Sequence, residues 1–317
     1  MRRGGGAGQP GPASSGPPDP ARAEFVLSKL ELLITRRLDG LLQGDYLGLL
    51  PGPGSEAGEA REYRAGDDVR RMDWPVTART TVPHVRQTIA DRELETWLAL
   101  DLSASLDFGT VTCLKRDLAI AAAASVAHLT VRGGNRIGAV VGTGDAVHRF
   151  AALPGRKGAQ ALLRNVVATP GAHGGGRTDL AALIDSLNRP PRRRGLAVVI
   201  SDFLTDSAWE RPMRKLAVRH DVLAVEVVDP RELELTGAGV MEFVDPETGV
   251  RHEVDTSDAG LRARYAEHAT AQRGAIARAL RHAGVAQLRL RTDSDWLIDI
   301  VRFVAGQRHA RTRGTTR

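Results

Sequence analysis

The sequence has little cysteine and no long apolar run. Its single cysteine, Cys113, cannot form an intramolecular disulfide, and no cluster of Cys and His has the spacing of zinc ligands, so we expect a reducing compartment and no zinc. The amino terminus lacks the apolar core of a signal peptide, and the best candidate for a membrane span, residues 118–129, is too short and contains His128. We therefore predict a cytoplasmic protein with no membrane span.

Aromatic residues are also scarce: four Trp, three Tyr and six Phe in 317 residues leave few side chains that could stack on bases. The formal charge of +6, from 44 Lys and Arg against 38 Asp and Glu, nevertheless suggests nucleic-acid binding. Much of this excess lies in residues 2–3, 192–194 and 308–313, which we interpret as solvated segments. We expect no specific nucleic-acid partner and keep a basic nucleic-acid-binding protein as a second alternative function.

Composition divides the chain into four parts. Residues 1–22 are rich in Gly, Pro, Ala and Ser and predict a disordered tail. Residues 23–90 form a smaller amino-terminal part, which begins with an amphipathic helix over 23–43. Residues 91–306 alternate apolar strands with helical patterns, and 307–317 form a basic tail. The alternation predicts an α/β fold with a mainly parallel central sheet and helices on both faces.

The expected elements of this α/β part follow from hydrophobic periodicity. We predict strands at 96–102, 137–141, 147–153, 196–200, 222–228 and 286–290, and helices at 114–131, 157–168, 179–187, 209–218, 257–283 and 296–304. The short turn at 142–145 predicts an antiparallel pairing of the strands around it, and 241–254 predicts an exposed hairpin.

A block of mixed charge at 61–79 fits neither an amphipathic helix nor an alternating strand. It interleaves four acids with five arginines around the turn signal Gly-Asp-Asp, which favours a network of charge-assisted hydrogen bonds over a plain solvated loop. Trp74 and Tyr63 indicate that part of the block packs. We expect it mainly to brace the amino-terminal part against the core, with some residues exposed.

Side-chain oxygens gather at three predicted strand ends or loops. Asp101, Ser103 and Ser105 follow the first strand of the α/β part, Thr178 follows a Gly-rich loop, and Asp202 follows the strongly apolar strand 196–200. Loops at the carboxyl ends of parallel strands converge, and carboxylate and hydroxyl oxygens suit Mg²⁺ or Mn²⁺. Taken alone, Asp101 and Ser103 also fit a simple helix cap. The two later positions favour the cation site, because a cap needs no distant partners.

The three stretches Asp-Leu-Ser-Ala-Ser, Gly-Arg-Thr-Asp-Leu and Ile-Ser-Asp-Phe resemble the metal-ion-dependent adhesion site of the von Willebrand factor A fold, a Rossmann-like architecture, over residues 91–305. The resemblance implies that Ser103, Ser105 and Thr178 bind Mg²⁺ or Mn²⁺ through their hydroxyls. It also implies that Asp101 and Asp202 bind the ion directly or through water, and that a carboxylate of a partner protein completes the coordination.

The block at 61–79 resembles the signature of the DUF58 family, whose members carry it ahead of a von Willebrand A-like domain. The matching residues are Arg61, Tyr63, Gly66, Asp67, Asp68, Arg70, Asp73, Trp74 and Arg79. Thr77 and Met72 stand where the family usually has Ser and Ile. Many members begin with two membrane helices; this sequence shows no such apolar segments, so we expect a soluble variant. The resemblance implies a co-chaperone or adaptor that works with a MoxR-type AAA+ ATPase, its client, or both.

A metal-dependent hydrolase is the first alternative, because a bound Mg²⁺ can activate water. Asp107 or His173 would then be the base. The sequence contains no nucleophile elbow, P-loop or paired metal-site motif. We therefore predict a protein-interaction module and not an enzyme.

Overall fold

The computed structural model describes residues 30, 32–38, 60–63, 72–86, 95–132, 134–144, 146–171, 178–188, 195–245 and 249–314. The predicted tail at 1–22, the segment 64–71 with Gly66, Asp67, Asp68 and Arg70, the loop with His173, and the basic triplet 192–194 lie outside these residues. Within them, no helix is both long enough and apolar enough to cross a membrane.

The centre of the molecule is a sheet with the strand order β10-β7-β6-β3-β4-β5. Its strands are β3 (Glu95–Asp101), β4 (Arg136–Gly142), β5 (Val147–Pro154), β6 (Leu196–Ser201), β7 (Asp221–Val228) and β10 (Ala286–Arg291). Every neighbouring pair is parallel except β4 and β5, which are antiparallel, as the short turn between them requires. The predicted α/β class and mainly parallel sheet are confirmed.

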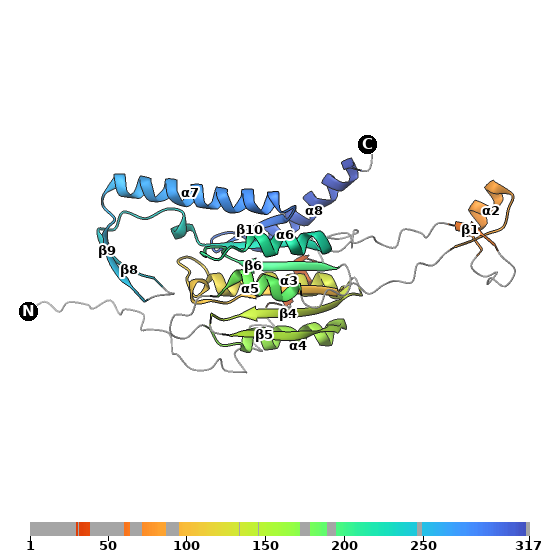
Figure 1. Cartoon of the computed structure of the whole chain (residues 1–317), viewed down its shortest axis with the longest axis horizontal. Helices are drawn as coiled ribbons and strands as arrows, with labels where there is room; N and C mark the ends of the chain where they lie inside the picture. The colour runs from red at the N-terminus through yellow and green to blue at the C-terminus, as the bar shows by residue number, and fades with distance from the viewer. Residues whose placement is uncertain are drawn as a thin grey trace, which may run out of the picture.

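Helices cover both faces of this sheet (Figure 1). One face carries α3 (Lys115–Arg132), α4 (Gly155–Ala168) and α8 (Trp296–Gly314), and the other carries α5 (Leu180–Leu187), α6 (Glu210–Arg219) and α7 (Ala259–His282). Successive strand residues point to opposite faces, so Leu98 and Leu100 of β3 pack in the first core and Ala99 in the second. Both faces are buried, which explains the nearly continuous apolar strands.

The last helix and the amino-terminal helix differ in extent from their predicted boundaries or are described only in part. Helix α8 runs to Gly314, so most of the segment 307–317, predicted as a loop-like basic tail, continues a helix. Of the predicted helix at 23–43, residues 30 and 32–38 are described and helical. Ile34 and Leu38, one turn apart, are buried in the core on the α3 side of the sheet, so this helix packs on the α/β domain.

Outside the central sheet, the predicted exposed hairpin is present as β8 (Val240–Val244) and β9 (Arg251–Asp255), which pair in antiparallel register. Two short 3-10 turns also matter for the site. η2 (Ala104–Leu106) follows β3, and η3 (Pro230–Glu232) follows β7.

The described part of the 61–79 block belongs to a small unit drawn apart from the central sheet in Figure 1. It comprises β1 (Ala60–Glu62), α2 (Trp74–Thr80) and β2 (His84–Arg86). Asp73 caps α2 by accepting a bond from the Val76 amide, and the Thr77 hydroxyl accepts one from the His84 amide at 2.9 Å.

These contacts give two of the signature positions a structural role. Ser, the usual family residue at position 77, offers the same hydroxyl. Tyr63 is half-buried and Arg79 is exposed. The expectation that Trp74 packs is wrong: its side chain is 66% exposed, because α2 buries no residue.

The chain order places the carboxyl ends of β3 and β6 at a topological switch point. From β3 the chain passes through α3 to β4 on one side, and later returns to β6 on the other side of β3. The connections therefore diverge above these two strands, which is where ligands bind in open α/β sheets.

Glycine at position 138 provides a test of this packing. A Cβ there would lie 2.8 Å from Cζ3 of Trp97 and 2.9 Å from the backbone nitrogen of Ala152, at the irregularity where β4 pairs with β5. We expect Gly138→Ala to lower the free energy of unfolding by about 1–3 kcal/mol through overpacking. Gly274→Ala, inside α7 with only the flexible end of Arg278 near its Cβ, is expected to raise it by about 0.5–1 kcal/mol.

Urea unfolding followed by circular dichroism measures both changes. Equal effects of the two substitutions would contradict the described packing of β4 between Trp97 and β5.

Candidate functional site

The structure brings the ends of β3 and β6 and the start of α5 together. Asp101 ends β3 and pairs in register with Gly142 of β4. Thr178, just before α5, accepts a hydrogen bond from the Gly144 amide at 3.0 Å, and a Cβ on Gly142 would lie 2.7 Å from the Thr178 methyl carbon. Thr178 thus lies beside Gly142, the strand partner of Asp101.

Asp101 is a buried carboxylate whose two oxygens are held by neutral donors. Its Oδ1 accepts from the Ser103 amide at 3.1 Å, and its Oδ2 accepts from the Ser201 hydroxyl at 2.9 Å. The residue is 5% exposed, and among the described residues no ion pair reaches it. Burial, together with the nearby charge of Asp202, raises the pKa of Asp101 to about 6. A buried carboxylate beside a second one is a place where a cation is stabilising.

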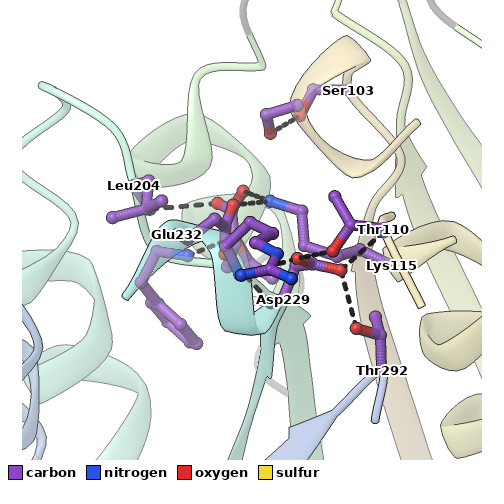
Figure 2. Close-up of polar contacts among 12 residues, drawn as sticks. Ser103, Thr110, Lys115, Leu204, Asp229, Glu232 and Thr292 are labelled. Carbon is purple, nitrogen blue, oxygen red and sulfur yellow. Dashed lines mark hydrogen bonds and ion pairs between the residues drawn. The ribbon is translucent and has the colours of Figure 1, made fainter. Parts of the chain in front are cut away.

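The two serines of the motif lie side by side. The Ser103 and Ser105 hydroxyl oxygens are 3.2 Å apart, and Figure 2 shows the contact at Ser103. Ser103 is the N-cap residue of η2, but its side chain makes no capping bond. A helix cap therefore explains the hydrogen bond from the Ser103 amide to Asp101. It does not explain why the Ser103 and Ser105 hydroxyls lie next to each other.

Asp202 is fixed in a different way, by an ion pair. Its Oδ2 accepts from the Lys115 ammonium at 2.8 Å and its Oδ1 from the Leu204 amide at 3.0 Å. Burial acts to raise the pKa of Asp202, but the charges of Lys115 and Arg273 and these hydrogen bonds outweigh it and hold that pKa below its usual value.

The backbone after Asp202 is held in an unusual conformation. Phe203 has a φ of 57°, which is rare for a bulky residue, and its ring packs edge-on against Trp209 with centroids 5.2 Å apart. This turn directs the Phe203 amide to the Ser201 hydroxyl and the Leu204 amide to Asp202. The strained turn therefore positions both Ser201 and Asp202.

Sequence reasoning missed the ionic network behind Asp202 (Figure 2). Lys115 also bonds Glu232, whose other oxygen accepts from Arg273 at 2.9 Å. Arg273 in turn reaches Glu226 at 3.1 Å. Against the cost of burial, the carboxylates of Asp202 and Glu232 raise the pKa of Lys115 and keep it charged. One signal was available: Glu226 interrupts an otherwise apolar run of β7.

Another buried carboxylate, Asp229, anchors the loop that follows the serine motif. It accepts from the Thr110 hydroxyl at 2.7 Å, the Thr110 amide at 2.9 Å and the Thr292 hydroxyl at 2.7 Å, as Figure 2 shows. Burial acts to raise the pKa of Asp229, and these bonds together lower it. Its role is structural, because its oxygens are occupied by the loop.

The donor set fits a hard cation better than a soft one. Among the described residues, no group of three or more His, Cys, Asp or Glu side chains is placed to hold a metal. Instead, a carboxylate without an ion pair lies beside two adjacent hydroxyls and a second carboxylate, which are oxygen ligands suited to Mg²⁺ or Mn²⁺. Of the two candidate bases, Asp107 lies 3.8 Å from the Arg116 guanidinium, and His173 is outside the described residues.

The raised pKa of Asp101 predicts a pH-dependent stability. Because the folded state binds this proton more tightly than the unfolded state, the ionised carboxylate destabilises the fold above pH 6, and this cost fades as pH falls toward 3.8. In chelator, we expect Asp101→Asn to raise the free energy of unfolding at pH 8 by roughly 1–3 kcal/mol. The gain shrinks below pH 6.

Urea unfolding at pH 8 and pH 5 measures this effect. Asn keeps an acceptor for the Ser103 amide but presents an N–H donor, in place of Oδ2, to the Ser201 hydroxyl. That exchange does not depend on pH, so the pH dependence of the difference, and not its size, reports the charge of Asp101. A pH-independent difference between variant and wild type would contradict the assigned burial of an ionised Asp101.

Three kinds of comparison place the chain among known proteins. An uncharacterized protein of Mycobacterium tuberculosis is 55% identical over 93% of this chain and 93% of its own length, and one of Mycobacterium bovis matches equally. The crystal structure of BatB from Bacteroides thetaiotaomicron is 13% identical, covers 68% of this chain and 99% of its own, and has a TM-score of 0.44. A von Willebrand factor type A structure from Catenulispora acidiphila is 16% identical over 46% of this chain and 35% of its own, with a TM-score of 0.33.

The family predicted from the 61–79 signature is the one found. The model described as "Protein of unknown function DUF58" matches residues 59–275, a range that holds the signature block, all five predicted metal ligands, and Lys115, Glu226, Glu232 and Arg273 of the ionic network. This α/β chain belongs to the DUF58 family.

Proposed function

We propose that this protein is a metal-dependent protein-interaction module, in which a divalent cation bridges the chain to a carboxylate of a partner. The observation that carries the proposal is Asp101: a buried carboxylate without an ion pair among the described residues, next to Asp202 and followed by two adjacent hydroxyls. Asp101, Ser103, Ser105 and Thr178 would hold Mg²⁺ or Mn²⁺, with Asp202 beside them.

The charge of this ligand set explains why an acidic partner fits. A single carboxylate with neutral hydroxyls leaves half of the charge of a divalent cation uncompensated. An incoming Asp or Glu side chain supplies the missing negative charge. Catalysis is the weaker proposal, because the described candidate base, Asp107, pairs with Arg116.

The loop after the serine motif supports a protein partner. Phe108, Val111 and Leu114 are 39%, 52% and 38% exposed, although they are large and apolar. The intervening threonines turn their hydroxyls inward, Thr110 to Asp229 and Thr112 to the Thr292 carbonyl.

This polar-in, apolar-out arrangement is the reverse of what a solvated loop needs. Phe108 is three residues from Ser105, at most about 11 Å along the chain, so the apolar surface of this loop begins close to the candidate metal site. Exposed apolar residues next to a charged site are typical of protein interfaces.

The partner we propose is a MoxR-type AAA+ ATPase, its client, or both, with the chain as co-chaperone or adaptor. Its support is the DUF58 family membership and the site described above. Under this proposal, the exposed Trp74 and Arg79 of the signature block are available for a second contact.

Metal binding is the first prediction of this proposal. We expect Mg²⁺ or Mn²⁺ to raise the melting temperature of the wild type at pH 7.5 and to give a saturable isotherm in calorimetry. Asp101→Asn should abolish both effects, and Ser103→Ala with Ser105→Ala should weaken binding at least about ten-fold, since ligands are lost.

The matched control is Asp107→Asn, which removes a nearby but exposed carboxylate and should bind as the wild type does. Undiminished binding by Asp101→Asn would place the ion elsewhere.

Partner binding is the second prediction. In a pull-down with the cognate MoxR-type ATPase, we expect capture with Mg²⁺ and its loss in chelator or with Asp101→Asn. Val111→Ser combined with Leu114→Ser should reduce capture at least about ten-fold, because apolar contact area is lost, while metal affinity stays unchanged.

Val218→Ser, which alters an exposed apolar residue of α6, is the control and should leave capture unchanged. Capture that survives chelation and the loop substitutions would contradict the metal-bridged interface.

A further inference from the structure

Lys115 is the most deeply buried cation near the candidate site. Its side chain is 1% exposed, and its ammonium lies between the Asp202 and Glu232 carboxylates (Figure 2). Burying a lysine is costly unless its charge is fully compensated, and two carboxylates provide that compensation.

The surroundings hold Lys115 in place. It begins α3, its amide donates to the Phe108 carbonyl at 2.8 Å, and its ammonium lies 5.9 Å from the centroid of the Phe108 ring. Asp202 is equally fixed by the Leu204 amide. Neither partner can turn away without leaving a buried charge unpaired.

The charges of the network are balanced without Asp101. Among the described residues, Lys115, Arg273 and Arg289 face Asp202, Glu226 and Glu232 in one connected set of ion pairs. Asp202 is therefore neutralised by the chain itself, whereas Asp101, the other carboxylate of the motif, has neutral hydrogen-bond donors.

We propose that Lys115 is a built-in counter-cation that withholds the Asp202 carboxylate from the divalent ion. The inference rests on the proposed function and deepens it. With Asp202 committed to Lys115, the ion is held by one carboxylate and hydroxyls, binds weakly on its own, and depends on the acidic partner for its second negative charge. Lys115 is thus a positioning residue, which acts through Asp202.

The test is Mn²⁺ titration of the full chain by calorimetry. Lys115→Met frees Asp202 and removes a competing positive charge, so we expect Mn²⁺ to bind at least about ten-fold more tightly than to the wild type. Mn²⁺ binding should also depend less on an added carboxylate in this variant. Acetate, used as the carboxylate probe, should enhance Mn²⁺ binding less in Lys115→Met than in the wild type.

The matched control is Arg289→Met. Arg289 belongs to the same network, but it pairs with Glu226 and does not contact Asp202. Losing its charge should change Mn²⁺ affinity by less than about two-fold. Equal tightening by both substitutions would overturn the specific role of Lys115, because it would reflect overall charge alone.

A second variant keeps the test decisive if Lys115→Met does not fold, as judged by circular dichroism. Glu232→Gln removes the second carboxylate that pairs with Lys115, so the ammonium pairs with Asp202 alone and more strongly. Mn²⁺ should then bind several-fold more weakly than to the wild type. Unchanged affinity in either folded variant overturns the inference and leaves the metal site standing. No Mn²⁺ binding by the wild type or by any variant overturns the proposed function itself.

Discussion

The buried ion pair between Lys115 and Asp202 joins the first residue of α3 to the residue that follows β6. Two charges leave water there, and the pair is stable only because every other polar group around it is also satisfied. The Leu204 amide donates to the Asp202 carboxylate, and Arg273 donates to the Asp202 backbone carbonyl. The Lys115 ammonium donates to Glu232 as well as to Asp202. Helix α7, strand β7 and turn η3 are thereby tied to the switch point. The geometry of the candidate site depends on this pair.

The two carboxylates of the site have separate roles as a result. Asp202 is part of the fold, with an internal cation, while the charge of the Asp101 carboxylate meets, among the residues that the structure describes, only neutral donors. The division lets one motif contribute to stability through Asp202 and leaves Asp101 for the proposed cation. The loop at 107–114 completes the surface, since its hydroxyls are used inside and its apolar side chains remain outside. The proposed metal-bridged contact would use this charge together with the exposed apolar side chains of the loop.

Much of the architecture was predictable because local pattern and burial agree. The apolar run of β6, with both faces covered, indicated a central parallel strand, and the short connection between β4 and β5 allowed only an antiparallel pair. Trp74 was predicted to pack and is exposed, because residue type alone does not reveal that α2 buries nothing. Helix α8 exceeded its predicted end, because its last turns lack the apolar periodicity used to find it.

The sequence by itself determined the elements, the order of the strand-end oxygens and the family, since these depend on local periodicity and on motifs read along the chain. Only the tertiary structure decided which carboxylate of the motif pairs with a cationic side chain: Asp202 pairs with Lys115. Lys115, Glu232 and Arg273 lie 30 residues or more from Asp202 in the sequence, and no pattern connects them to it. Ion pairing depends on distance in space and on exclusion of water, which the fold alone provides. The residue types make the stretch from Asp101 to Ser105 a candidate cation site. The fold directs Lys115 to Asp202, so that the negative charge of Asp101 remains for the proposed ion.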